Sequence, residues 1–218
     1  MEMYRDKSEE YFGNGRPEML QFLPDPLGKV LEIGCGGGAF AARLKGRYPR
    51  SHVTAIEPMR EAAEGARERV DELLIGDVES SLTNLADRQF DTIVLNDVLE
   101  HLVDPWDILK KLRRHLTPDQ GTVVVSLPNV RYFPVFKSYV SGAQWRYESE
   151  GVMDRTHLRF FTKKSIEHLF ESSGYKVIRL EGINPMALTW KVNLLNRLTG
   201  GSFEDLQYMQ FACVAKPA

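Results

Sequence analysis

The chain has 218 residues, 43% of them hydrophobic and 27% charged, with a formal net charge of −2 at pH 7. These values suit one globular domain with its own core, and a charge so near zero gives no general attraction to nucleic acid. The first ten residues are too charged for a secretory signal, and no apolar run approaches membrane-spanning length. The only cysteines are Cys35 and Cys213, which indicates neither a disulfide framework nor a metal cluster. We therefore expect a cytoplasmic protein without a bound metal.

The N-terminal residues 4–23 read as a helical segment, and we expect residues 1–26 to form a lid over a ligand site. Arg16 lies within this segment, where it could hold an anionic group of the ligand. A solvated surface arginine is the alternative reading.

The stretch Val30–Phe40, V-L-E-I-G-C-G-G-G-A-F, reads as a buried strand, a glycine turn and the start of a helix. Glycines allow a tight turn and leave room for a ligand against the main chain. Gly34, Gly36 and Ala39 also satisfy the dinucleotide-binding pattern G-x-G-x-x-G/A, so the spacing alone leaves a dehydrogenase open. Glu32, two residues before the turn, would repel a pyrophosphate but could accept a hydrogen bond from an ammonium group.

Strand and helix patterns alternate from residue 30 to residue 127, which predicts a parallel sheet with right-handed crossovers. The next strands are expected at 53–57, 71–77, 90–97 and 122–127, and two final strands at 175–180 and 207–215. Glu57 follows Gly34 by the offset at which an acid meets ribose hydroxyls in such folds. Glu57 could otherwise be a charge at a helix N-terminus, and Gly76-Asp77 could be only a turn.

Two motifs carry a resemblance to a known family. Glu32, Gly34, Gly36 and Gly38 fit the form hh(D/E)hGxGxG, and residues 91–105 fit D-x-h-x-x-x-x-x-h-E-H-h-x-D-P. The chain resembles the class I S-adenosylmethionine-dependent methyltransferases on these residues. The resemblance implies a single α/β domain over 1–218. Its doubly wound, Rossmann-like sheet would have seven strands in the order 3-2-1-4-5-7-6, with the last strand antiparallel.

The resemblance also implies S-adenosylmethionine as methyl donor and S-adenosylhomocysteine as product. Asp77 would accept from the adenine amino group, Val78 would pack on the ring, and Arg16 could hold the methionine carboxylate. The whole expected donor-binding set is Arg16, Glu32, Gly34, Cys35, Gly36, Gly38, Glu57, Pro58, Asp77, Val78, Asn96 and Asp97. The motif [N/D]-P-P-[Y/F/W] is absent, which argues against methylation of adenine N6 or glutamine.

Residues 129–164 interrupt the alternation and are expected to form a substrate cap after strand five. The segment is rich in aromatic residues and carries seven basic against three acidic side chains. This composition suggests a small anionic or polyhydroxylated substrate, held by rings and guanidinium groups. The candidate substrate-binding residues are Arg131, Tyr132, Trp145, Arg155 and Arg159. A cap with its own small core and solvated charges is the alternative.

The stretch D-R-T-H-L-R-F-F-T at 154–162 resembles a subgroup of bacterial methyltransferases associated with glycan assembly. That resemblance implies transfer to a hydroxyl of a saccharide or of a phosphorylated or nucleotide-linked sugar. A hydroxyl needs a base, and His157 and His101 are the candidates because both follow strand ends. Either histidine could instead brace the site. An amine or quinone-like phenol as acceptor, or a binding partner without turnover, are the alternative functions.

An extra helix is expected within residues 182–206, with an apolar stripe of Leu188, Val192, Leu195 and Leu198. Such a helix could be a lid or the surface of a homodimer. Simple packing of the stripe on the sheet is the favoured reading.

Overall fold

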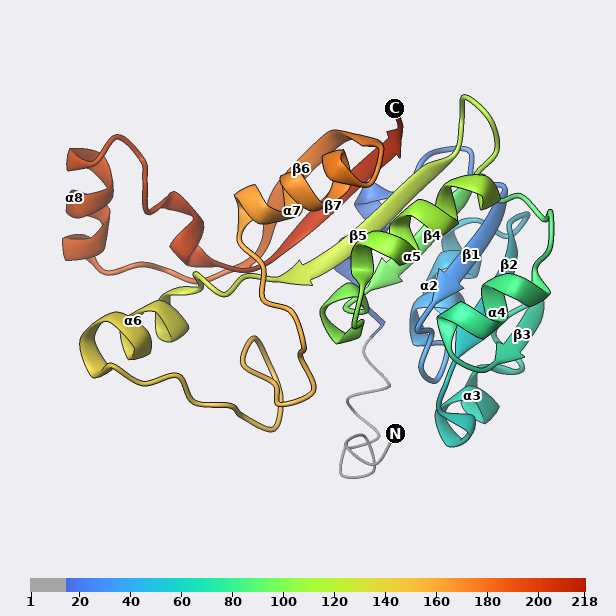
Figure 1. Cartoon of the computed structure of the whole chain (residues 1–218), viewed down its shortest axis with the longest axis horizontal. Helices are drawn as coiled ribbons and strands as arrows, with labels where there is room; N and C mark the ends of the chain where they lie inside the picture. Colours follow the sequence, from blue (N-terminus) through green and yellow to red (C-terminus); the bar gives the residue numbers. More distant parts are fainter. Residues whose placement is uncertain (1–14) are drawn as a thin grey trace.

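The computed structural model describes residues 15–218 and contains one sheet in the order β3-β2-β1-β4-β5-β7-β6 (Figure 1). The first five strands pair in parallel, and β7 runs antiparallel to both β5 and β6. The predicted α/β fold and strand order are therefore confirmed. The strands are β1 (Lys29–Ile33), β2 (His52–Glu57), β3 (Glu72–Ile75), β4 (Thr92–Asn96), β5 (Thr122–Pro128), β6 (Tyr175–Pro185) and β7 (Tyr208–Pro217).

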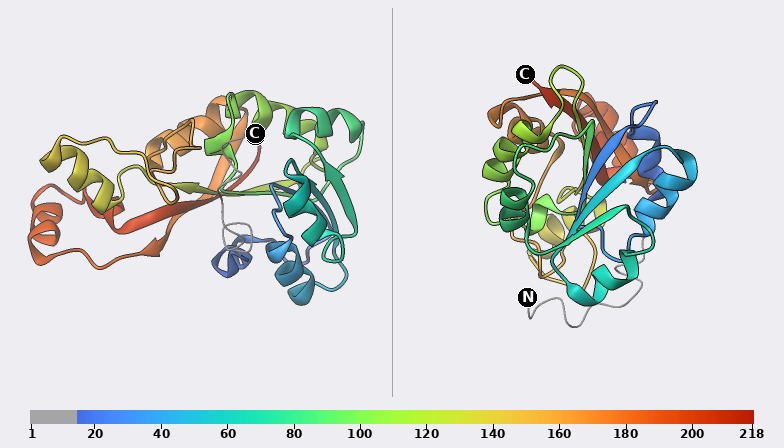
Figure 2. Two further views of the ribbon diagram at one scale, coloured as in Figure 1. Left: turned by 90° about the horizontal axis from the view of Figure 1, so that it is seen from below. Right: turned by 90° about the vertical axis from the view of Figure 1, so that its right-hand side faces the viewer.

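Helices cover both faces of the sheet, as the end-on view in Figure 2 shows. The α-helices are α2 (Ala39–Arg47), α3 (Arg60–Ala66), α4 (Val78–Asn84), α5 (Pro105–Leu112), α6 (Phe133–Gly142), α7 (Lys163–Ser172) and α8 (Trp190–Leu198). The short 3-10 helices are η2 (Pro17–Phe22), η3 (Leu99–His101), η4 (Arg113–His115) and η5 (Glu204–Gln207).

The core has two large parts, one on each face of the sheet, because side chains alternate across each strand. In β5, Val123 and Val125 join the cluster under α4, α5 and α7, whereas Val124 joins the cluster under η2 and α2. Strands buried on both faces read as continuous apolar runs, which is why the sequence located them.

Two expected elements differ in extent. The leading segment contributes a 3-10 helix, Pro17–Phe22. Residues 1–14 of the predicted lid, which was expected over 1–26, lie outside the described residues. Strand β6, expected over 175–180, continues to Pro185 alongside β7. The added length of these two strands carries the segment between them away from the parallel sheet (Figure 1).

Helix α8 projects from that end of the molecule, near α6, and buries none of its residues (Figure 1). Trp190 and Leu198 are 71% and 76% exposed. The favoured expectation that this stripe packs on the sheet is therefore wrong, because β6 and β7 hold the helix beyond the sheet's covered faces. A lid or a homodimer surface stays a prediction.

Among residues 15–218, no helix combines the length and the apolar character needed to cross a membrane.

Candidate active site

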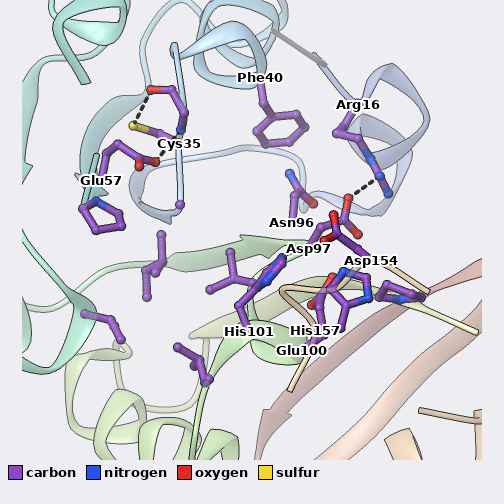
Figure 3. Close-up of a pocket in the computed structure, with 18 of the residues that line it drawn as sticks. Arg16, Cys35, Phe40, Glu57, Asn96, Asp97, Glu100, His101, Asp154 and His157 are labelled. Atoms are coloured by element: carbon purple, nitrogen blue, oxygen red, sulfur yellow. Dashed lines mark hydrogen bonds and ion pairs between the residues drawn. The ribbon is translucent and has the colours of Figure 1, made fainter. Parts of the chain in front are cut away.

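A cavity of about 630 Å³ opens at the carboxyl ends of β1, β2 and β4 (Figure 3). This is the edge where doubly wound sheets bind ligands, and the volume suits a small molecule. Eleven of the twelve predicted donor-binding residues line it. They are Arg16, Glu32, Gly34, Cys35, Gly36, Glu57, Pro58, Asp77, Val78, Asn96 and Asp97.

The glycine turn keeps its backbone open to the cavity. Gly34 has φ 74°, and a Cβ atom there would lie 2.6 Å from Cγ2 of Val98. Gly38 is the predicted residue that does not line the cavity. It caps α2 with φ 76°, and a Cβ atom there would come within 3.0 Å of the Ala66 backbone on α3. Gly38 therefore serves the close packing of α3 against the turn.

Glu57 ends β2 and ties that strand to the glycine turn. One carboxylate oxygen accepts from the Gly36 amide at 2.8 Å and the other from the Met59 amide at 2.9 Å. Burial raises the pKa of Glu57, and these two backbone hydrogen bonds oppose the shift. The bonds fix the orientation of both oxygens, whose remaining lone pairs can accept from ligand hydroxyls.

Glu32 is only 3% exposed, and its Oε2 has no hydrogen-bond partner among the described residues. Burial and then the nearby charge of Glu57 raise the pKa of Glu32 to about 8. A buried carboxylate without a donor is costly, so the site is incomplete until a cationic or hydrogen-bonding group arrives. An ammonium group of a ligand has the right chemistry.

Asp77 and Val78 stand at the end of β3, as predicted. Oδ1 of Asp77 accepts from the Ser80 amide at 2.7 Å and so caps α4. Hydrogen bonds from the backbone amide and then the side chain of Ser80 lower the pKa of Asp77. The acid thus remains ionised and has a second oxygen for a ligand donor.

Arg16 is buried at 6% exposure and pairs with Asp97, at the end of β4. The other oxygen of Asp97 accepts from the Ser126 hydroxyl at 3.0 Å and the Gln210 amide at 2.8 Å. The alternative of a solvated surface arginine is excluded. The side-chain amide of Asn96 is buried beside them and has no hydrogen-bond partner in the described part of the chain.

The two candidate histidines meet at the far wall of the cavity (Figure 3). Their ring centroids lie 4.8 Å apart with the rings inclined by 67°. Nδ1 of His157 lies 3.0 Å from the Val152 carbonyl oxygen, and Nδ1 of His101 lies 3.2 Å from that of Thr156. A carbonyl only accepts, so Nδ1 carries the proton in each neutral ring and Nε2 carries the lone pair.

Glu100 is a site residue that the sequence analysis missed. Its side chain is fully buried, and neither carboxylate oxygen has a hydrogen-bond partner among residues 15–218. Burial and then the charge of Asp97 raise its pKa well above the ordinary range. The adjacent E-H pair in the 91–105 motif was the available signal, but a short 3-10 turn gives no periodicity that predicts burial.

None of the five predicted substrate-binding residues lines the cavity. Arg131 instead pairs with Asp205 at 3.3 Å and donates to the Ser202 carbonyl at 2.7 Å. Arg155 is exposed. Tyr132 stands at the N-terminus of α6.

Trp145 and Arg159 also have partners within or near the insertion. The Trp145 ring lies 5.2 Å from that of Phe160 and 5.9 Å from that of Tyr139. Arg159 donates to the Val103 carbonyl and lies 6.0 Å from the Trp106 ring. The insertion reaches the cavity through Glu150–Val152, Asp154 and His157 instead.

Comparison with known proteins decides the family. A family model described as "Methyltransferase domain" matches residues 4–180. The chain belongs to this methyltransferase family. The chain is also similar to a ubiquinone biosynthesis O-methyltransferase of Aeromonas salmonicida, with 26% identity over 88% of this chain and 81% of the relative. A malonyl-[acyl-carrier protein] O-methyltransferase of Geobacter sulfurreducens is 28% identical over 70% of this chain and 57% of the relative.

Solved structures support the fold. A structure described as a SAM-dependent methyltransferase from Archaeoglobus fulgidus has a TM-score of 0.66 and 17% identity, covering 96% of this chain and 94% of that one. Another, from Mesorhizobium loti, has a TM-score of 0.62 and 18% identity over 96% and 98%. At these identities the likeness concerns the fold, and the chemistry must be argued from the cavity.

Proposed function

We propose that this methyltransferase transfers a methyl group from S-adenosylmethionine to a hydroxyl of a small polyhydroxylated molecule. A saccharide, or a phosphorylated or nucleotide-linked sugar, is the acceptor class that we propose. The observation that carries the proposal is one cavity with two chemically different ends. One end holds the acids at the strand ends, Glu32, Glu57 and Asp77, and the other holds His101 and His157.

The donor end fits S-adenosylmethionine residue by residue. Glu32 has an unpartnered oxygen for the ammonium group, and Glu57 has fixed oxygens for two ribose hydroxyls. Asp77 and Val78 would hold the adenine. Arg16 would hold the methionine carboxylate in addition to its ion pairs with Asp97 and Glu18. Bound S-adenosylmethionine supplies an electrophilic methyl group on a sulfonium, and the products are S-adenosylhomocysteine, the methyl ether of the acceptor and a proton.

The acceptor end has the means to take up that proton. A hydroxyl is a poor nucleophile until a base removes its proton during attack. The Val152 carbonyl favours the tautomer of His157 whose Nε2 accepts a proton. The backbone amides of Leu158 and Arg159 donate to the Glu100 carbonyl at 2.8 and 3.0 Å. These bonds hold the insertion, and His157 with it, against η3.

The hydroxyl-rich class of acceptor rests on the polar lining at this end, together with the subgroup resemblance of residues 154–162. Glu150, Asp154, Asn184 and Gln210 also line the cavity. Arg155 lies outside the cavity lining. We therefore place the hydroxyl-bearing part of the acceptor inside and any phosphate outside. We also propose that the protein forms a homodimer through the exposed leucines of α8, which sedimentation equilibrium tests. A cytoplasmic location is proposed as well.

A phenolic acceptor is the second candidate, and the similarity to the named ubiquinone biosynthesis O-methyltransferase favours it. Transfer of labelled methyl from S-adenosylmethionine to panels of sugars, sugar phosphates, nucleotide sugars, catechols and amines separates the candidates. Label in the sugar panels supports the proposal, and label only in catechols or amines replaces it. Donor binding without transfer to any panel supports a binding partner without turnover.

Replacing Asp77 by alanine should weaken S-adenosylhomocysteine binding about tenfold, because a charged acceptor for the adenine amino group is lost. The same change removes the α4 cap and lowers the free energy of unfolding by about 1 kcal/mol. Asp77→Ser keeps a capping oxygen but shortens its reach, so it should keep the stability and lose the affinity. Calorimetric titration and thermal unfolding measure the two effects. An unchanged dissociation constant in both variants would remove Asp77 from the adenine site.

A further inference from the structure

Three side chains at the far wall of the cavity form a cluster with the composition of a metal site. Glu100 and His101 come from η3, and His157 comes from the insertion (Figure 3). One potential ligand atom from each lies within 4.8 Å of the others. Ligands of Zn²⁺ lie at about 2.0–2.2 Å from the ion, so shifts of about an ångström would bring all three into one coordination sphere.

The histidines are arranged as metal-ligating histidines usually are. Such a ligand donates its other ring N–H to a backbone carbonyl or carboxylate, which fixes the ring and its tautomer. His101 and His157 both place Nδ1 at a main-chain carbonyl, of Thr156 and Val152 respectively. The lone pair of each neutral ring is then on Nε2, the nitrogen that could coordinate an ion.

Glu100 supplies the independent observation. Its carboxyl group is fully buried, and neither oxygen has a hydrogen-bond partner among the described residues. Buried carboxylates are normally paired or bound to a metal, because a lone buried charge is costly. Besides burial, the charges of Asp97 and Asp154 raise the pKa of Glu100, and the charge of Arg16 only partly offsets them. A cation next to Glu100 would remove this cost.

We propose that Glu100, His101 and His157 bind a divalent transition-metal ion at the wall of the cavity. Two imidazole nitrogens and one carboxylate suit Zn²⁺, Co²⁺ or Fe²⁺ and leave coordination positions open. The ion would join the insertion to η3 and so complete the acceptor end of the cavity. The expectation of no metal rested on the cysteine count, which does not cover a site built from histidine and glutamate.

Because Glu100, His101 and His157 line the cavity, a ligand from the acceptor could reach an ion bound by them. An acceptor hydroxyl bound to the ion would lose its proton more readily, because a bound cation lowers the pKa of a coordinated oxygen. With the ion bound, Nε2 of His157 would be a ligand and not the base, so the proton would leave to water or to a carboxylate lining the cavity as the oxygen takes the methyl group. This role rests on the proposed function, whereas the binding of the ion does not.

Cobalt titration of the chelator-treated, dialysed full chain tests the site directly. We expect one Co²⁺ per chain, with the visible absorption of nitrogen and oxygen coordination. Glu100→Gln and His157→Ala should each weaken Co²⁺ binding at least tenfold. His168→Ala, an exposed histidine on α7, is the matched control and should bind as the unaltered chain does.

Thermal unfolding shows whether a variant that binds Co²⁺ weakly is still folded. Glu100→Gln preserves shape and removes the buried charge, so without metal it should unfold at the same or a higher temperature than the unaltered chain. Co²⁺ should raise the unfolding temperature of the unaltered chain and leave that of Glu100→Gln unchanged. Absence of saturable Co²⁺ binding to the unaltered chain would overturn the proposal. Binding of Co²⁺ by Glu100→Gln and His157→Ala as tight as that of the unaltered chain would overturn it as well. S-adenosylhomocysteine titration of the metal-free chain tests the proposed function separately.

Discussion

Glutamine in place of Glu32 is expected to stabilise the ligand-free protein at pH 8 while weakening donor binding at least tenfold. The carboxyl group is buried and its pKa is raised to about 8, so the ionised form is disfavoured in the folded state. The gain in free energy of unfolding at pH 8 should be on the order of 4 kcal/mol. The loss of affinity follows from removing the carboxylate that would meet the donor's ammonium group.

The pH dependence has a defined sign. The folded pKa of Glu32, about 8, lies above its ordinary value of 4.5, so the folded state binds the proton more tightly than the unfolded state. Ionisation of Glu32 therefore does not lower the free energy of unfolding below about pH 4.5. The destabilisation grows as the pH rises from about 4.5 to about 8. The two proteins should have similar stability at pH 4.5 and diverge toward pH 8.

Thermal unfolding across this pH range, with calorimetric titration of S-adenosylhomocysteine, checks both effects. Glu61→Gln, an exposed acid on α3, is the matched control and should change neither. Equal stability of the Glu32→Gln and unaltered proteins at pH 8, together with equal affinity, would show that Glu32 does not face the donor.

Alanine in place of His157 is expected to lower kcat by about 10² to 10⁴, the usual contribution of a positioned acid–base group. The dissociation constant for S-adenosylhomocysteine should change less than threefold, because Glu32, Glu57 and Asp77, the acids proposed to hold the donor, belong to β1, β2 and the end of β3 and not to the His157 segment. Single-turnover methyl transfer and calorimetry separate the two quantities. His168→Ala serves as control. Turnover close to that of the unaltered protein would remove His157 from the chemistry.

That Glu32, Glu57 and Asp77 lie in one cavity was predictable from sequence because parallel strands align their carboxyl ends at one edge. Glu32, Glu57 and Asp77 stand at fixed places relative to three apolar runs, and all three line the cavity. Gly38 shows the limit of such reasoning. The motif includes it, but its backbone serves helix packing rather than the cavity.

The acceptor end was harder to predict because long-range contacts decide it. Arg131 looked like a substrate contact by composition, yet it pairs with Asp205 near β7. Trp145 packs against Phe160 within the insertion. Glu100 was overlooked since its burial depends on the insertion folding over η3. No local sequence pattern predicts these long-range contacts.

Calorimetric titration of the full chain with S-adenosylhomocysteine tests the central claim most directly. The account predicts saturable binding of one molecule per chain, lost or much reduced in Glu57→Ala, whose carboxylate would hold the ribose. Titration with NAD under the same conditions should give no binding. A folded protein that binds NAD, or that binds no S-adenosylhomocysteine, would contradict the assignment of this cavity to a methyl donor.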